Sequence, residues 1–137
     1  MLNKAQLIGH IGKEPKITTT ESGYTIANFS VATTERGYTS KDGKQIPDRT
    51  EWHNVVCYGK LAEIVKNYAE KGAKVYVEGK MRTRKYEDRE GINRSIVEIH
   101  ADQINIITRP QHNDQQQARP KAEYNLFGNS NSDDVPF

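Results

Sequence analysis

The sequence predicts an all-β domain that contains a single helix and is followed by a polar tail. Three observations indicate this. Apolar residues recur at every second position over most of residues 1–109, one segment instead repeats at three and four residues, and both patterns end near Pro110. Side chains of a strand alternate between two faces, whereas those of a helix return after about 3.6 residues, so the two periods identify the two kinds of element.

Five segments are predicted to be strands, because apolar or β-branched residues recur in them at every second position or form a continuous run. They cover residues 5–11, 25–33, 52–58, 75–86 and 95–107. Turn sequences such as Asp42-Gly43 and Glu90-Gly91 punctuate the chain between strands. In the fourth segment we expect Val75, Val77 and Met81 to face the core.

Residues 60–72, KLAEIVKNYAEKG, break the period of two and predict a helix of about three turns. Gly72 occupies the place of a glycine that ends a helix. The residues that recur at intervals of three and four are Leu61, Ile64, Val65, Tyr68 and Ala69. Three strands, this helix and two further strands are the order of an OB-fold, a five-stranded Greek-key barrel with its helix between the third and fourth strands. A small α+β sandwich is the alternative fold.

The tail divides the chain into a predicted domain over residues 1–109 and a predicted disordered segment over 110–137. Gln, Asn, Asp, Ser and Pro dominate this segment, and such a composition buries too little apolar surface to offset the entropy lost on ordering. The whole chain is only 34% hydrophobic, with a mean hydropathy of −0.86. We expect a flexible tail, or a partner subunit that completes the burial, to account for these values.

Charge is also divided along the chain. Residues 1–109 hold 18 basic and 14 acidic side chains, giving +4, whereas residues 110–137 hold 2 basic and 4 acidic ones, giving −2. This division suggests a domain that binds a polyanion and carries a tail of opposite sign.

Several classes of protein are disfavoured by the sequence. No apolar run approaches the ~18 residues of a membrane-spanning helix, and the first residues lack the apolar stretch of a signal peptide. Cys57 is the single cysteine, so no intrachain disulfide is expected. No metal-ligand spacing relates the four histidines, which are His10, His53, His100 and His112. No phosphate loop or catalytic carboxylate pair is evident, so we expect a cytoplasmic protein without enzymatic activity, cofactor, metal or membrane contact.

A basic surface is the clearest candidate for function. Four alternate positions of the fourth predicted strand share one face. They are occupied by Lys80, Arg82, Arg84 and Tyr86, and Lys85 adds to the charge. A ladder of cations that ends in an aromatic residue is typical of a surface that binds nucleic acid. An ordinary solvated face is the alternative interpretation.

Aromatic residues accompany these cations. Trp52 and Tyr58 share the parity of the third predicted strand and lie about 20 Å apart at ~3.3 Å per residue. Tyr38 lies in the polar segment ERGYTSKDGKQ, where little would bury it. An exposed ring can stack on any base, at about 1–3 kcal/mol per base, so these residues are candidates to bind unpaired nucleic acid without sequence preference. The alternative is that Trp52 and Tyr58 belong to the core.

Several motifs resemble those of the bacterial single-stranded DNA-binding protein family. They include Thr50-Glu51-Trp52-His53, Val55-Val56, Tyr58-Gly59-Lys60-Leu61-Ala62-Glu63, Val75-Tyr76-Val77-Glu78-Gly79 and Arg82-Thr83-Arg84-Lys85-Tyr86. At the other end of the chain, Asp133-Asp134-Val135-Pro136-Phe137 is similar to the family's acidic tip. This tip has two aspartates where three are usual, and the tail lacks the long Gly-rich linker of many members.

The resemblance implies a non-catalytic OB-fold that assembles as a homotetramer and binds single-stranded DNA during replication, recombination and repair. Trp52, Tyr58 and Tyr86 match the family's stacking aromatics. Tyr38 is a fourth candidate, in a loop whose length differs from the common pattern, and His53 matches a position of subunit contacts. The resemblance also implies a nucleoid-associated location, and recruitment of replication, recombination and repair proteins through residues 133–137.

Phosphate contacts are expected from seven cations. They are Lys80, Arg82, Arg84, Lys85, Lys4, Arg36 and Arg49. Each phosphate that a cation neutralises on a single strand contributes about −0.7 to the slope of log affinity against log salt. Two alternative functions are an OB-fold module that prefers RNA and an adaptor whose basic ladder meets an acidic protein.

Overall fold

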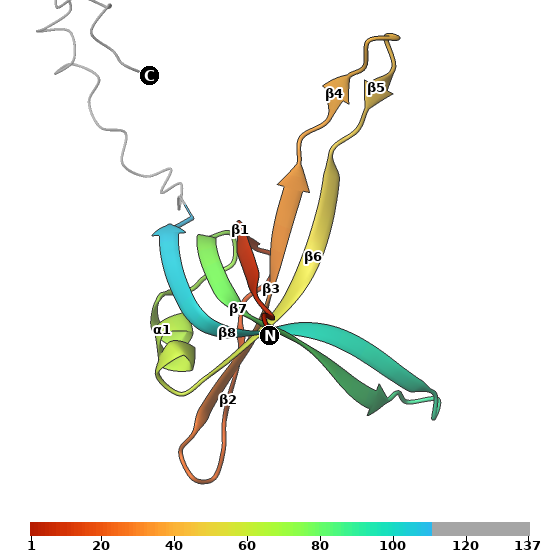
Figure 1. The fold of residues 1–137 in the computed structure, drawn as a ribbon. Coiled ribbons are helices and arrows are strands. Elements are labelled where there is room, and N and C mark those ends of the chain that lie inside the picture. The colour runs from red at the N-terminus through yellow and green to blue at the C-terminus, as the bar shows by residue number, and fades with distance from the viewer. Residues whose placement is uncertain (111–137) are drawn as a thin grey trace, which may run out of the picture.

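The computed structural model describes residues 1–110, which form a small barrel with long hairpin arms (Figure 1). Its elements are β1 (Ala5–Ile11), β2 (Lys16–Thr19), β3 (Thr25–Glu35), β4 (Tyr38–Thr39), β5 (Gln45–Ile46), β6 (Arg49–Tyr58), α1 (Lys60–Tyr68), β7 (Lys74–Glu87) and β8 (Asn93–Thr108). The predicted tail beyond Pro110 and its acidic tip, residues 133–137, lie outside the described residues.

Five strands form a closed ring. β1 pairs with β7, β7 with β8, β8 with β6 and β6 with β3, and β3 returns to β1 through His10↔Ala32 and Ile11↔Val31. These pairings are antiparallel except for that of β6 with β8, which is parallel. Along the chain, three strands of the ring precede α1 and two follow it. The predicted OB-fold barrel is therefore confirmed, and the α+β sandwich is wrong.

Gly9 allows the ring to close. A Cβ atom built on Gly9 would lie 2.2 Å from the backbone oxygen of Ala32 and 2.8 Å from Cγ1 of Val31. Only a residue without a side chain lets two backbones approach this closely. The glycine therefore belongs to the crossing of β1 and β3.

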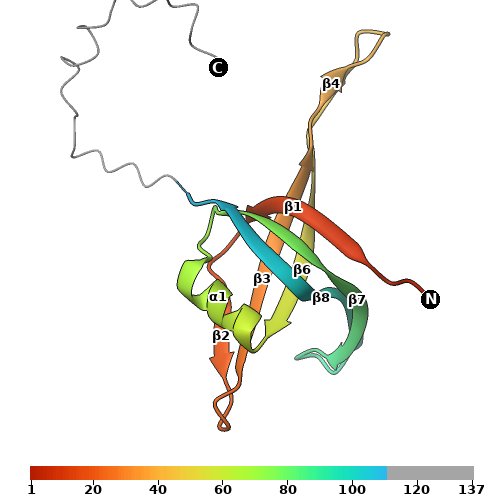
Figure 2. The same cartoon turned by 60° about the vertical axis from the view of Figure 1, so that its left-hand side comes forward.

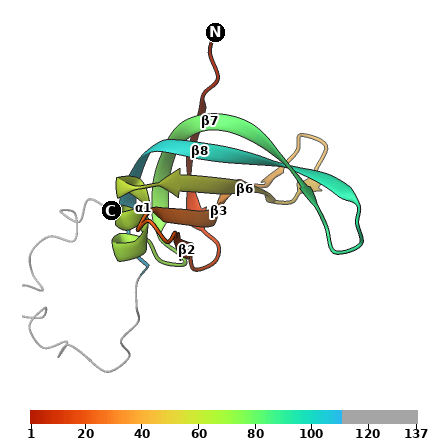
Figure 3. The same cartoon turned by 90° about the horizontal axis from the view of Figure 1, so that it is seen from below.

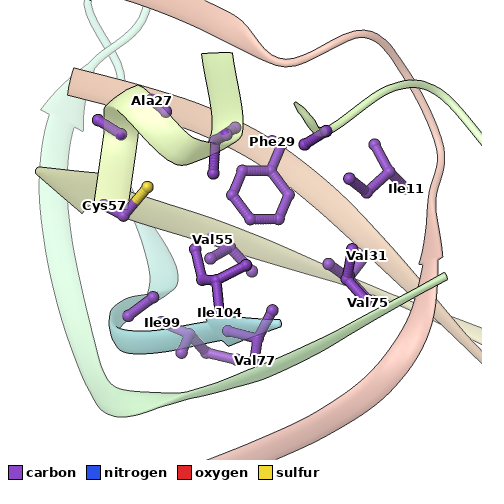
Figure 4. Close-up of a cluster of buried hydrophobic side chains, with 14 of the residues drawn as sticks. Ile11, Ala27, Phe29, Val31, Val55, Cys57, Val75, Val77, Ile99 and Ile104 are labelled. Carbon is purple, nitrogen blue, oxygen red and sulfur yellow. The ribbon is translucent and has the colours of Figure 1, made fainter. Parts of the chain in front are cut away.

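The core lies inside the ring and is supplied mainly by alternate residues of each strand. In β8 the buried parity changes between Ala101 and Ile104, where the register with β7 shifts. Figure 4 shows the ring of Phe29 among the aliphatic side chains of neighbouring strands. The buried residues of the strands include Ile11, Ala27, Phe29, Val31, Val55, Cys57, Val75, Val77, Ile99 and Ile104. Burial raises the pKa of the Cys57 thiol to about 11, so this cysteine stays protonated at neutral pH.

The helix α1 lies at one end of the barrel (Figures 2 and 3). It buries Ala62 and Val65 against the core, and the Thr25 hydroxyl of β3 donates a hydrogen bond of 2.5 Å to Oε1 of Glu63. The prediction of a helix up to Gly72 is wrong, because α1 ends at Tyr68. Gly72 lies in the following turn with φ 87°. Its N–H bonds to the Ile11 carbonyl at 2.8 Å, which ties the start of β7 to β1.

Two hairpins extend beyond the barrel as arms (Figure 1). The arm of β3 and β6 carries the short β4–β5 hairpin at its tip, where Tyr38 pairs with Ile46. The arm of β7 and β8 runs from Lys80↔His100 to Glu87↔Asn93. The separate strands β2, β4 and β5 were not predicted from the sequence.

The prediction that Met81 faces the core is wrong. Its side chain is 51% exposed, although Val75 and Val77 on the same face of β7 are fully buried. Gly79 is the last buried residue of β7. Beyond it the strand leaves the barrel, so both of its faces meet solvent.

Candidate nucleic-acid interface

One face of the sheet joins the predicted aromatic residues to the predicted cations. Trp52 and Tyr58 occupy even positions of β6. β6 lies beside β8 with Asn54 opposite Glu98, and Glu98 is in turn opposite Arg82 of β7. Residues opposite one another on paired strands share a face. The even positions of β6, of β8 as far as His100 and of β7 from Lys80 to Tyr86 therefore lie on one continuous surface.

Two adjoining hollows of about 620 and 590 Å³ follow this surface, and we call them together the groove. Trp52 lines the first hollow and Tyr58 lines the second. The hollows are continuous because they share Asn28, Val56, Arg84 and Glu98.

The indole of Trp52 lies over the backbone of Gly12 at one end of the groove. A Cβ atom built on Gly12 would lie 2.1 Å from Cζ3 of Trp52, so the ring covers a position that only glycine leaves open. The Trp52 side chain is 59% exposed. The backbone of Gly12 supports the indole, while much of the Trp52 surface remains open to solvent. This geometry suits base stacking.

Tyr58 lies at the other end of the groove, between two further rings. Its ring centroid is 6.3 Å from that of Tyr24, with an angle of 16° between planes, and 5.7 Å from that of His100. Tyr58 is 39% exposed. Although the same face carries buried Val56, the two predicted aromatics of β6 are not core residues, and that alternative is wrong.

The other two predicted aromatics lie on the arms. Tyr86 is exposed near the tip of the β7–β8 arm, and the guanidinium carbon of Arg84 is 5.6 Å from the centroid of its ring. Tyr38 is exposed on β4, at the tip of the other arm, and does not line the groove. Their stacking roles stay predictions.

Four of the seven predicted phosphate-binding cations are exposed and form no ion pair within residues 1–110. They are Arg36, Lys80, Arg82 and Lys85. Arg82 and Lys85 line the second hollow of the groove beside Tyr58. Their charges are therefore available to an anion that enters the groove.

The other three cations are paired with carboxylates. Nη2 of Arg84 lies 2.9 Å from Oε1 of buried Glu98, and Nη2 of Arg49 lies 3.3 Å from Oε1 of Glu51. Nζ of Lys4 lies 2.8 Å from Oε1 of Glu78. The hydrogen bond between Lys4 and Glu78 raises the pKa of the lysine and lowers the pKa of the glutamate. These three cations already have anionic partners before any ligand binds.

The groove contains residues that sequence reasoning missed. Lys13 and Lys16 line its first hollow beside Trp52, on the segment that connects β1 to β2 and on β2 itself. Gly12 is also part of this hollow. In the sequence, no alternating pattern relates these residues to the cations of β7. They lie near those cations because the five strands close into a ring.

Other candidates from the sequence have simple local contacts. Nε2 of His53 lies 2.8 Å from the hydroxyl of Thr33 on β3, and its role in subunit contacts stays a prediction. Within residues 1–110, no group of three or more His, Cys, Asp or Glu side chains is placed to hold a metal ion. No helix within that range has the length and apolar character needed to cross a membrane.

A five-stranded OB barrel with exposed rings and cations in an open groove is typical of modules that bind single-stranded nucleic acid. The chain belongs to the single-strand binding protein family, whose sequence profile matches residues 2–107. The resemblance found in the sequence motifs is thereby confirmed.

Individual relatives agree with this assignment. The chain is 49% identical over 107 residues to a single-stranded DNA-binding protein of Bacteroides thetaiotaomicron, and 42% identical over 106 residues to one of Neisseria meningitidis. These matches cover 78% and 77% of this chain, and 66% and 60% of the two relatives. A solved structure described as Plasmodium falciparum SSB complex with ssDNA superposes with a TM-score of 0.70 at 31% identity. The superposition covers 79% of this chain and 97% of the chain in that structure.

Proposed function

We propose that this chain binds single-stranded DNA without sequence preference, and that it does so in the groove. The observation that carries the proposal is that the exposed rings of Trp52 and Tyr58 line the same groove as Arg82 and Lys85. Membership of the family and the names of the relatives, which are single-stranded DNA-binding proteins, support it. The solved neighbour is a complex with ssDNA.

Two independent contributions hold the strand. Aromatic rings stack on bases whatever the sequence, and cations displace the counterions that are condensed on the phosphates. Duplex DNA is rejected because its bases already stack on one another. The aromatic candidates are Trp52, Tyr58, Tyr86 and Tyr38.

Replacement of Trp52 by alanine tests the stacking contribution. We expect Trp52→Ala to weaken binding to poly(dT) by about 1–3 kcal/mol while leaving the slope of log affinity against log salt nearly unchanged, because no charge is lost. Fluorescence anisotropy of labelled poly(dT) measures both quantities. Unchanged affinity would mean that Trp52 does not stack on DNA.

Replacement of Arg82 tests the phosphate contribution more cleanly than that of Arg84. Loss of Arg84 leaves the carboxylate of Glu98, whose side chain is 7% exposed, without its arginine partner, so the variant changes more than one charge. Arg82 has no such partner within residues 1–110. We expect Arg82→Ala to flatten the salt slope by about 0.7. A slope equal to that of the unmodified chain would contradict a phosphate contact.

Trp52 also reports on the two alternative functions, because it is the single tryptophan. Quenching of its fluorescence by oligo(dT) is expected for a DNA-binding protein but not for an adaptor that binds acidic proteins. Competition between oligo(dT) and oligo(U) separates a DNA-binding protein from one that prefers RNA. Stronger binding of oligo(U) would contradict our proposal.

We also propose that residues 133–137 bind replication, recombination and repair proteins. This segment combines the carboxylates of Asp133 and Asp134 with the aromatic side chain of Phe137, which suits a pocket with a hydrophobic floor and a basic rim. We propose further that the chain acts as a homotetramer in the cytoplasm, in association with the nucleoid. The resemblance supports His53 as a contact between subunits. A mass measurement in solution tests the tetramer.

Deletion of Phe137 separates this tip from the DNA-binding groove. We expect the deletion to abolish pull-down of repair and replication proteins but to leave affinity for oligo(dT) unchanged, because it leaves all the residues named in the groove in place. Pull-down on the immobilised full chain and on the shortened chain makes the comparison. Equal capture by both chains would contradict the proposed role of the tip.

A further inference from the structure

Tyr24 lies on the same surface as the groove but beyond its end. It directly precedes β3, in the connection from β2, and is two positions before Ile26. Ile26 is opposite Tyr58 in the pairing of β3 with β6. Because side chains two apart on a strand share a face, the parity that carries Tyr58 continues to Tyr24. The β2–β3 hairpin extends from the barrel away from the β4–β5 hairpin (Figure 1).

The ring of Tyr24 is fixed although it is exposed. Its N–H donates a hydrogen bond of 3.0 Å to the Thr20 hydroxyl, and its carbonyl accepts one of 2.9 Å from the Thr20 N–H. The ring of Tyr24 is nearly parallel to that of Tyr58. It also lies over Gly59, because a Cβ atom built on Gly59 would be 3.6 Å from Cε2 of Tyr24. Even so, Tyr24 is 51% exposed, more than the 39% of Tyr58.

An exposed aromatic ring whose backbone is held in place suits base stacking. Ordering of a ring that is already fixed loses little entropy when a ligand binds. Tyr24, Tyr58 and His100 together form a row of rings, with centroid separations of 6.3 and 5.7 Å. This row extends past the groove and onto the β2–β3 hairpin.

We propose that Tyr24 stacks on a base of the bound single strand and extends the DNA path beyond Tyr58 by at least one nucleotide. This inference rests on the proposed function of the groove. The sequence shows Tyr24 only as one tyrosine near the turn Ser22-Gly23, and its partnership with Tyr58 comes from the pairing of β3 with β6.

Tyr24→Ala tests the proposal, with Tyr24→Phe retaining the ring. Tyr68→Ala is the matched control, because Tyr68 is 50% exposed but lies at the end of α1 beside Arg109. Affinity is measured by fluorescence anisotropy on labelled oligo(dT) of graded length. We expect Tyr24→Ala to weaken binding of the longer oligomers by about fivefold or more, as loss of one stacked base does. Tyr24→Phe and Tyr68→Ala are expected to bind as the unmodified chain does.

Oligomer length and a second variant separate a direct contact from a support for Tyr58. If Tyr24 stacks on its own base, Tyr24→Ala has little effect on oligomers too short to reach it, and it lowers affinity again in a Tyr58→Ala background. A loss that vanishes in the Tyr58→Ala background, or that is equal at every oligomer length, overturns the proposal. The proposal is also overturned if Tyr24→Ala leaves affinity unchanged and Trp52→Ala still weakens binding. Failure of both variants to weaken binding instead removes the proposed function.

Discussion

Gly12 and Trp52 form a residue pair that neither residue reveals alone. Because Gly12 has no side chain, the indole can lie across the backbone directly after β1. The Gly12 N–H donates a hydrogen bond of 3.1 Å to the Ser30 carbonyl. Trp52 is thus held against the barrel at the mouth of the groove. The orientation of an exposed ring is set here by a neighbour that has no side chain.

A methyl group at this position is expected to displace the ring without unfolding the barrel. In Gly12→Ala the new Cβ would lie 2.1 Å from Cζ3 of Trp52, and the indole can swing away because it is 59% exposed. We expect weaker oligo(dT) binding, approaching the loss seen in Trp52→Ala, together with a shift in tryptophan emission. Thermal unfolding followed by circular dichroism is expected to change little. Unchanged emission and affinity would contradict this role of Gly12.

Glu98 is an acidic residue in a groove that we propose to bind a polyanion. Its Oε1 lies 2.9 Å from Nη2 of Arg84, and its Oε2 lies 3.4 Å from Nε2 of His100. A buried carboxylate is tolerated only with partners that satisfy it. Arg84 therefore has a structural role in addition to any contact with phosphate.

The β7–β8 arm is the element that carries most of the predicted cations, and its turn is organised by Asp88. Oδ1 of Asp88 accepts hydrogen bonds of 2.9 Å from the N–H groups of Glu90 and Ile92. Oδ2 forms an ion pair of 2.5 Å with Nε of Arg94. The bond from Arg94, followed by those from the backbone, lowers the pKa of Asp88 below its ordinary value of 3.8.

This turn is expected to loosen in acid. A carboxylate whose pKa is lowered by folding stabilises the fold above its unfolded pKa, and the contribution is lost as the pH falls through the lowered value. We expect the amide chemical shifts of Glu90 and Ile92 to stay constant near neutral pH and to move only below about pH 3.8. NMR titration measures this. Asp88→Asn is the control, since it cannot titrate, and identical titration curves for both chains would contradict the assignment.

At the scale of the whole molecule, we expect the seven predicted cations to contribute unequally to phosphate binding. Arg84, Lys4 and Arg49 have carboxylate partners at 2.9, 2.8 and 3.3 Å, whereas the remaining four form no ion pair within residues 1–110. A cation that already neutralises a carboxylate releases less counterion when DNA arrives. The positive charge that the seven cations offer to DNA is therefore smaller than their number suggests.

The salt dependence of DNA binding measures how many cations act. The four unpaired cations together with Lys13 and Lys16 of the groove, at about −0.7 each, predict a slope near −4 per chain. Adding the three paired cations would give about −6. We expect the value near −4 from oligo(dT) titrations between low and moderate salt. A slope near −6 would indicate that DNA breaks the ion pairs of Arg84, Lys4 and Arg49, and would contradict our expectation.

Much of the fold followed from the sequence, because alternation reports which residues share a face of a strand. It identified the five strands of the ring, the helix between the third and fourth, and the shared parity of Trp52 with Tyr58. It failed at Met81, since parity does not tell where a strand leaves the barrel. It failed also at Gly72, because α1 ends at Tyr68 and the Gly72 N–H bonds instead to the carbonyl of Ile11, which lies far away in the chain.

Local sequence determined the strands, the single helix and the residue types available for stacking and charge. Only the tertiary structure decided which of those residues meet. On one face of β6 it buries Val56 but leaves Trp52 and Tyr58 exposed, and it brings Lys16 and Tyr24 to that surface from another hairpin. The physical reason is that exposure and ion pairing depend on neighbouring strands. Closure of the ring between β1 and β3 sets those neighbours, and no short stretch of sequence contains them.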